Sequence, residues 1–276
     1  MMDKKIKIGA VAWGLPGGGY FAPQIACMAG LDGVQLELGS YEWGYPLSQR
    51  EIRDIYMEAG SLLGIEYPSI VLNDVMVHEF IHGRDSENWK IALEQVDLGL
   101  DAAHEMGIDQ IMIPNFENNL ITEYEHEENT AEFLRIACDK AKVYNITVLT
   151  ETALDYHRQT GLIAQIGKDN LRLFFDSQNY KFFSGLDQTE QLSFLLPYMT
   201  NQIHLKDGIK KPGGKRLGEG CMQFAEQAEL LEQAGFEGWL ILENYYNQMF
   251  GGKDCRTHQM ALLKDDIETV KKHFHI

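Results

Sequence analysis

The sequence is poor in cysteine and lacks long apolar runs. Its four cysteines, Cys27, Cys138, Cys221 and Cys255, are far apart, and no Cys-x-x-Cys pair occurs. We therefore expect reduced, mostly structural thiols, as in a cytosolic protein. No apolar run approaches the roughly 18 residues of a membrane span, and the start, MMDKKIKIGAVAWG, lacks the long apolar segment of a signal peptide. The sequence therefore predicts a cytoplasmic protein without a membrane partner.

Positive charge is also scarce. The 276 residues include 24 Lys and Arg against 41 Asp and Glu, which gives a net charge of −17. An acidic surface repels polyanions at long range, and binding to duplex nucleic acid needs many cationic contacts to phosphate. Nucleic acid is therefore not an expected partner. Apolar residues make up 45% of the chain, which is ordinary for a globular protein and excludes a disordered one.

The sequence does contain a regular alternation of short apolar runs and longer amphipathic stretches. The runs are β-branched and too short for helices. They span residues 6–13, 34–38, 65–71, 110–114, 146–151, 171–176, 202–206 and 239–243. The clearest helical pattern between them is residues 86–106, with Ser86 as a candidate N-cap and Gly107 as a candidate C-cap.

Alternating strands and helices indicate a parallel sheet with right-handed crossovers. Eight units in 276 residues average about 34 residues each, which suits a closed barrel. An open doubly wound sheet would want a nucleotide-binding signature at its first crossover, and GLPGGG at 14–19 matches neither the dinucleotide nor the phosphate-loop pattern. No linker or low-complexity tract interrupts the alternation. We therefore predict an α/β fold, a single (β/α)₈ TIM barrel domain over residues 1–276.

Polar side chains stand at or near the ends of the last four predicted strands, in the order Glu151, Asp176, His204 and Glu243. Each spacing is about one β/α unit, so the four arrive on adjacent strands at the face where barrel enzymes keep their active sites. Three carboxylates and one imidazole suit one divalent ion, with Mn²⁺ or Zn²⁺ first and Mg²⁺ or Co²⁺ as alternatives. Without an ion, converging carboxylates would repel one another.

The segments that carry these residues resemble a known family. TETAL, FFDSQNY, IHLKDG, RLGEG and LILENY are similar to the xylose isomerase-like superfamily of sugar phosphate isomerases and epimerases, which are TIM barrels. Its members include ketose 3-epimerases, pentulose-phosphate 3-epimerases, hydroxypyruvate isomerases and inosose dehydratases. The resemblance implies that the four strand-end residues are the metal ligands. It also implies that Glu151 and Glu243 form the catalytic acid/base pair.

The chemistry that this family carries out begins with proton abstraction next to a carbonyl group. Such a hydrogen is weakly acidic, so its removal requires a positioned base and stabilisation of the enediolate, which a chelated divalent ion supplies. Two carboxylates on opposite faces of the substrate let one remove a proton and the other return it. We therefore expect a metal-dependent sugar or sugar-phosphate isomerase or epimerase, such as a ketose 3-epimerase, with a small-molecule sugar as its partner.

Three alternatives stay open at this point. The same residues would serve an inosose-type dehydratase. Many epimerases of the family carry His at the position of Asn179, and Asn cannot relay a proton, whereas the resemblance includes dehydratase-like members with Asn there. A phosphodiesterase of the apurinic endonuclease type would need more than the nine histidines of this chain and a basic face. A non-catalytic binding protein would hold no metal ion.

Further residues are candidates for substrate binding. They are Trp13, Glu37, Asn115, His157, Asn179 and Arg216. The indole of Trp13 would stack on a sugar or belong to the core. Glu37 would point into the pocket or form a salt bridge, and the asparagines would bind sugar oxygens. His157 would bind substrate or lie exposed.

One stretch of this acidic chain is locally basic. The seventh βα loop holds Lys206, Lys210, Lys211, Lys215 and Arg216 around a Pro-Gly-Gly centre. Such a loop would bind a phosphate or another anionic sugar group, or simply be solvated. Arg216 is the candidate contact because it directly precedes LGEG, whereas Lys206 is expected to pair with a carboxylate.

Two other patterns leave questions open. His78, Glu79 and His82 have the HExxH spacing of a zinc-binding helix, but their place in the third βα loop of a barrel does not suit a protease, so we expect no shared zinc site. The aromatic segment 244–250, NYYNQMF, would cover the pocket mouth or a neighbouring subunit. The sequence therefore leaves a homo-oligomer open.

Overall fold

The computed structural model describes residues 5–249 and 255–276. Within this part of the chain, eight parallel strands in the order β1 to β8 close into a barrel, with helices between the strands. The predicted (β/α)₈ TIM barrel is therefore confirmed. The strands are β1 (Ile6–Val11), β2 (Gly33–Glu37), β3 (Ile70–Val71), β4 (Gln110–Pro114), β5 (Thr147–Glu151), β6 (Leu171–Asp176), β7 (Met199–Leu205) and β8 (Gly238–Leu242).

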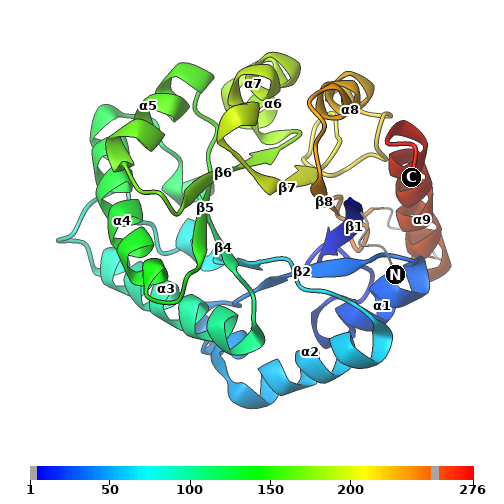
Figure 1. Ribbon diagram of the computed structural model, residues 1–276, viewed down its shortest axis with the longest axis horizontal. Helices are drawn as coiled ribbons and strands as arrows, with labels where there is room; N and C mark the ends of the chain where they lie inside the picture. The colour runs from blue at the N-terminus through cyan, green and yellow to red at the C-terminus, as the bar shows by residue number, and fades with distance from the viewer. Residues whose placement is uncertain (1–4, 250–254) are drawn as a thin grey trace. The chain divides into compact units, whose positions relative to one another are not determined.

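The helices follow the strands in the expected alternation (Figure 1). They are α1 (Ala22–Ala29), α2 (Arg50–Leu63), α3 (Glu87–Met106), α4 (Tyr124–Lys142), α5 (Tyr156–Ile166), α6 (Asn179–Ser184), α7 (Gln188–Leu195), α8 (Phe224–Gln233) and α9 (Cys255–His273). Short 3₁₀ helices lie at Gly19–Phe21, Tyr41–Trp43, Pro46–Ser48, Asn73–Met76, Glu117–Asn119 and Leu196–Tyr198. The segment after β6 thus contains two α-helices, α6 and α7.

The third strand is shorter than the sequence predicts. The expected strand spans residues 65–71, whereas β3 contains only Ile70 and Val71. Pro68 lies inside the predicted run, and it has no backbone N–H to donate to a strand ladder. On its N-terminal side an isolated bridge joins Glu66 to Gly33.

The described chain divides into two compact units. Of the described residues, the first contains 5–35, 58–67, 175–249 and 255–276, and the second contains 36–57 and 68–174. A single domain over residues 1–276 therefore stays a prediction.

In the first unit, β1 pairs with β8 and with the start of β2, and β7 pairs with β8. The register places His204 opposite Ile241 and Leu205 opposite Leu242. The carboxyl ends of β7 and β8 therefore lie level with each other. Helix α9 packs against α1 and α8, which Figure 1 shows on the outer side of these strands.

In the second unit, β4 and β5 pair over their whole length, from Gln110 opposite Thr147 to Pro114 opposite Glu151. An aromatic cluster packs beneath the connecting helices. The rings of Phe80 and Phe133 stack with their centroids 3.9 Å apart. The Trp89 ring of α3 meets Phe133 of α4 edge-on, with the centroids 5.1 Å apart, so the cluster joins these two helices.

The predicted boundaries of the clearest helix are confirmed. The Ser86 hydroxyl accepts a hydrogen bond from the Trp89 backbone N–H at 3.1 Å, so Ser86 is the N-cap of α3. Gly107 ends the helix at a φ of 69°, a left-handed conformation that glycine adopts without steric cost.

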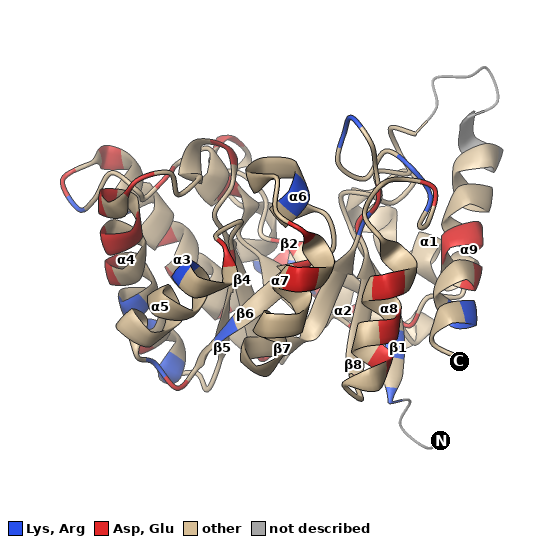
Figure 2. Ribbon diagram, turned by 90° about the horizontal axis from the view of Figure 1, so that it is seen from above, with Lys and Arg blue, Asp and Glu red and all other residues tan. Residues whose placement is uncertain are grey.

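The surface features agree with the composition. Of the described helices, none combines the length and apolar character needed to span a lipid bilayer. Cys27, Cys138 and Cys221 are free thiols. Figure 2 shows acidic residues along α4, α8 and α9, with basic residues gathered in the loops above α8.

Candidate metal centre

Three of the predicted strand-end residues meet inside the first unit. Asp176 is the last residue of β6, His204 the penultimate residue of β7, and Glu243 directly follows β8. Nδ1 of His204 lies 3.1 Å from Oε2 of Glu243 and 3.7 Å from Oδ2 of Asp176. All three side chains are buried. Two carboxylates and one imidazole nitrogen thus converge from three successive strands.

A lysine lies between the two carboxylates. Nζ of Lys206 is 2.7 Å from Oε2 of Glu243 and 3.0 Å from Oδ2 of Asp176, and the lysine side chain is only 4% exposed. Residues 204 and 206 point to the same side because side chains alternate along an extended strand. The expected pairing of Lys206 with a nearby carboxylate is therefore confirmed.

Gln35 orients the imidazole of His204 from the other side. Its amide oxygen Oε1 lies 2.6 Å from Nε2 of His204, and both residues are fully buried. Because an amide oxygen only accepts, Nε2 carries the proton of this bond. Nδ1 is the nitrogen that faces the carboxylates. A ring whose far nitrogen donates to an oxygen, with the near one facing the site, has the arrangement of a metal-ligating histidine.

Trp13 borders the same cluster. Its indole N–H donates to Oε1 of Glu243 at 3.3 Å, and its ring meets the His204 ring edge-on, with the centroids 6.4 Å apart. The side chain is half-buried. Trp13 therefore contacts a predicted ligand, which places it beside the centre.

Burial and the neighbouring charges act differently on the two acids. Burial raises the pKa of Asp176, and Glu243 raises it further, while Lys206 and His204 oppose the change. Burial also works to raise the pKa of Glu243, but His204 and Lys206 together bring it well below its usual range. Glu243 is therefore stabilised as a carboxylate by its two cationic or polar neighbours.

The β7–α8 loop is anchored next to the cluster by Asp207. Its carboxylate accepts backbone N–H groups from Gly208 at 2.8 Å, Gly218 at 2.9 Å and Gly220 at 3.0 Å. Burial raises the pKa of Asp207, and these hydrogen bonds counteract the rise. Asp207 of the HLKDG segment thus holds the backbone of the LGEG segment in place.

Glu151 is the last residue of β5, in the second unit, and it is buried. Its carbonyl accepts the Asn115 backbone N–H at 2.8 Å. Its role as a metal ligand beside the residues of the first unit stays a prediction.

The chemistry of this donor set fits a divalent ion. Asp176 and Glu243 bring two carboxylate groups, and His204 brings one imidazole nitrogen that faces both of them. Carboxylate oxygens combined with one imidazole nitrogen suit ions of intermediate hardness such as Zn²⁺ and Mn²⁺. The residues present therefore fit a metal of the predicted kind.

Two predicted substrate-binding asparagines lie at strand ends. Asn179 opens α6, is 5% exposed, and its backbone N–H donates to Oδ1 of Asp176 at 2.7 Å. Asn115 follows β4 and is fully buried, and its Nδ2 donates to the Asn119 carbonyl at 3.4 Å. In the second unit, Oδ1 of Asn115 has no hydrogen-bond partner among the described residues.

Arg216 and His157, two further substrate-binding candidates, lie on the surface of the chain. Arg216 forms ion pairs with Glu219 and Asp265, so both carboxylates engage its guanidinium. His157 is exposed in the first turn of α5. Substrate contacts by these two residues stay predictions.

Glu37 lines a hollow of about 400 Å³ in the second unit. It accepts a hydrogen bond from Nδ2 of Asn73 at 3.2 Å, and burial raises the pKa of its carboxyl group. No salt bridge of Glu37 is present among the described residues. Binding of substrate by Glu37 stays a prediction.

The HExxH residues go to separate partners. The segment follows the 3₁₀ helix Asn73–Met76 and is not helical. His78 contacts Asp74 at 2.8 Å, whereas Glu79 accepts from Asn88 at 2.9 Å. The His82 ring meets His126 edge-on. The HExxH spacing brings two histidines to one face only on a helix, and residues 78–82 are not helical. His78 and His82 therefore do not form the histidine pair of a zinc protease.

Gln35 was not among the predicted site residues, although the strand pattern carries a signal for it. It is a polar residue inside the apolar run VQLEL, fully buried and facing His204. A buried polar side chain in a strand interior requires a partner, which a single sequence does not name.

The comparisons with known proteins agree with this architecture. The family described as the xylose isomerase-like TIM barrel matches residues 24–273. A 2-epi-5-epi-valiolone 7-phosphate 2-epimerase of Actinoplanes sp. is 29% identical over 273 residues, covering 96% of this chain and 94% of the relative.

Two solved structures share the fold at low identity. A D-allulose 3-epimerase from Methylomonas sp. has a TM-score of 0.75 and 14% identity, covering 98% of each chain. The IOLI protein with a bound zinc atom has a TM-score of 0.76 and 14% identity, covering 98% of this chain and 100% of that one. At such identity these two show the fold alone. Because the family match extends over most of the sequence, this chain belongs to the xylose isomerase-like TIM barrel family.

Proposed function

We propose that the protein is a divalent-metal-dependent isomerase or epimerase of a sugar or sugar phosphate. The observation that carries the proposal is the convergence of Asp176, His204 and Glu243, with Nδ1 of the histidine facing both carboxylates. Glu151 would complete the ligand set. The similarity to a 2-epi-5-epi-valiolone 7-phosphate 2-epimerase supports this class of reaction.

A divalent ion held by these four residues would polarise the substrate carbonyl and make the neighbouring C–H more acidic. The chain supplies the proton carriers. Glu151 comes from β5 and Glu243 from β8, so the two glutamates are borne by strands that are not neighbours in the barrel order. One carboxylate would remove the proton and the other would return one, which inverts the configuration at that carbon.

The remaining residues would hold the reacting groups in place. Gln35 fixes the ring of His204, and Trp13 donates a hydrogen bond to Glu243. Lys206 compensates negative charge between Asp176 and Glu243, which keeps two buried acids close together. A proton carrier that is already held in one orientation reacts faster, because no further entropy is lost in orienting it during the reaction.

Proton exchange with solvent tests the proposal. A panel of ketoses, cyclitol ketones and their phosphates would be incubated with the enzyme in D₂O, with carbon-bound deuterium as the readout. We expect Glu151→Gln and Glu243→Gln to lower the rate of incorporation by about 10²- to 10⁴-fold. Glu237→Gln, which alters an exposed glutamate paired with Lys5, is the matched control and should keep the rate.

The product distinguishes the proposal from its alternatives. Epimerisation or isomerisation leaves the mass unchanged apart from the deuterium, whereas dehydration gives a product lighter by one water. Full incorporation in the Glu151→Gln enzyme would remove that residue from the mechanism.

A further inference from the structure

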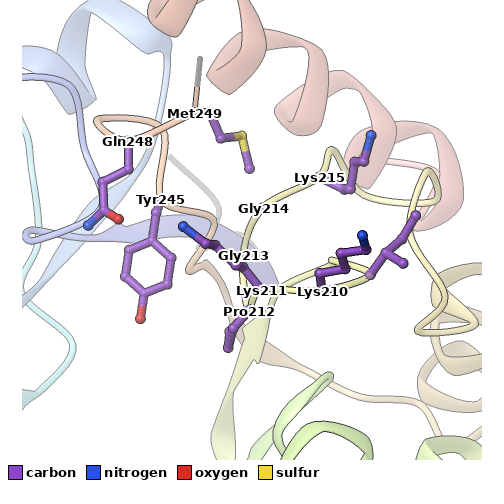
Figure 3. Close-up of a pocket in the computed structure, with 10 residues that line it drawn as sticks. Lys210, Lys211, Pro212, Gly213, Gly214, Lys215, Tyr245, Gln248 and Met249 are labelled. Carbon is purple, nitrogen blue, oxygen red and sulfur yellow. The ribbon is translucent and has the colours of Figure 1, made fainter. Parts of the chain in front are cut away.

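A second cavity lies in the first unit, formed by the loops that follow β7 and β8. Its volume is about 470 Å³. The β7–α8 loop contributes residues 209–215, and the segment after β8 contributes Tyr245, Gln248 and Met249. Figure 3 shows Tyr245 and Gln248 extending from one side and the lysines of the loop from the other. Nothing in the proposed proton transfer uses this cavity.

The lining is cationic in a strongly acidic protein. Lys210, Lys211 and Lys215 line it, and among residues 5–249 and 255–276 no Asp or Glu does. Lys210 and Lys211 have no carboxylate partner among residues 5–249 and 255–276, and both are exposed. Lys215 helps to lower the pKa of Glu219, although Arg216 contributes more to that change. Two or three ammonium groups are therefore available to an anion in a concave site.

One wall of the cavity packs on the backbone of Glu243, a predicted metal ligand. Gly213 donates its backbone N–H to Oε1 of Gln178 at 2.9 Å and accepts the Tyr245 N–H at 3.0 Å. A Cβ on Gly213 would come within 2.9 Å of the Glu243 carbonyl oxygen, and its φ is 59°. Glycine thus lets the basic loop pack on the backbone of a predicted catalytic residue.

The loops after the seventh and eighth strands are a frequent place for phosphate groups in TIM barrels. Here the cavity combines loop lysines with the phenol of Tyr245 and the amide of Gln248, which are donors for phosphate oxygens. Its volume also exceeds that of a phosphate group, so part of a carbon skeleton fits in the cavity beside the anion. Arg216, the contact expected from the sequence, does not line the cavity.

We propose that this cavity binds the phosphate group of a phosphomonoester sugar substrate, with Lys210 and Lys211 as the principal contacts. The assignment of the phosphate to a substrate rests on the proposed function. The substrate class of the metal centre is then a phosphorylated sugar. The basic loop binds its phosphate group, and the metal centre binds its reacting end.

Binding of defined probes tests the cavity without turnover. Fructose 6-phosphate, inorganic phosphate and fructose would be titrated calorimetrically into chelator-treated protein, so that no metal ion contributes to the affinity. The double variant Lys210→Gln and Lys211→Gln is compared with wild type. The matched control is Lys90→Gln and Lys168→Gln, which removes the same charge from two ion-paired lysines outside the cavity.

We expect fructose 6-phosphate to bind wild type at least about tenfold more tightly than fructose. The cavity variant should weaken this binding about ten- to hundredfold, with the control variant unchanged. Absence of phosphate binding in wild type, or equal weakening in both variants, would overturn the proposal. Specific phosphate binding without deuterium exchange on any sugar would instead count against the proposed function and leave the cavity's anion site standing.

Discussion

Nζ of Lys206 lies 2.7 Å from Oε2 of Glu243, and both side chains are buried. The same nitrogen is 3.0 Å from Asp176, so one ammonium group serves two acids. Removal of one partner of a buried ion pair leaves charge without compensation, which costs more than the pair contributes. The stability of the centre without metal therefore depends on Lys206.

Lys206→Met should lower the free energy of unfolding by about 3–5 kcal/mol in the presence of a chelator. A bound divalent ion would replace much of the missing charge, so the loss should be smaller with metal. Urea denaturation with and without metal measures both values. Lys7→Met, which removes a surface partner of Glu66, should cost only about 0–1 kcal/mol and be indifferent to metal. If Lys206→Met lowered the free energy of unfolding equally with and without metal, Lys206 would not compensate charge at the metal site.

Gln35→Leu should weaken metal binding about 10- to 100-fold. The reason is that His204 loses the acceptor at Nε2 that orients its ring. Gln35→Glu keeps an acceptor oxygen and should restore much of the affinity. Calorimetric titration of Zn²⁺ or Mn²⁺ into chelator-treated protein provides the comparison. Unchanged affinity in the leucine variant would show that the ring is held by other contacts.

We expect the free energy of unfolding to fall between about pH 4 and about pH 6, because the carboxyl group of Asp266 loses its proton in this range. Burial raises the pKa of this carboxyl to about 6, although hydrogen bonds from Tyr246, Asn244 and Leu217 oppose the rise. The native state therefore holds the proton more tightly than the unfolded chain, whose carboxyl has a pKa of about 3.9. The stabilisation is complete below about pH 4 and is lost as pH passes about 6, a change of about 3 kcal/mol.

Asp266→Asn removes this titration. Denaturation of wild type and variant at about pH 4.5 and about pH 7 should show the advantage of wild type shrinking at the higher pH. A constant difference between the two proteins across that range would contradict the assignment. Retained secondary structure by circular dichroism establishes that the variant is folded.

The architecture follows from local signals that a single sequence carries. Ser86 and Gly107 mark the ends of α3 because capping is decided by adjacent residues. Pro68 shortens β3 because it has no backbone N–H to donate to the neighbouring strand. The apolar pattern of residues 65–71 alone does not predict this.

The partners of the site are harder to predict because they are distant along the chain. Gln35 and His204 are separated by 169 residues, and nothing in VQLEL names the imidazole that its amide meets. Arg216 shows the converse. Its place in the basic loop directly before LGEG predicts an anion contact, whereas in the structure its guanidinium pairs with Glu219 and Asp265. Polar residues can be located on a strand or loop from sequence, while their pairing requires the fold.

The most direct test of the metal centre is the metal content of the protein purified without chelators. Elemental analysis of wild type should give about one divalent ion per chain, and Asp176→Asn should lower that content at least about tenfold while keeping the wild-type circular dichroism spectrum. A wild-type protein that contains no divalent ion, and that still exchanges substrate protons at full rate after exhaustive chelation, would contradict the account.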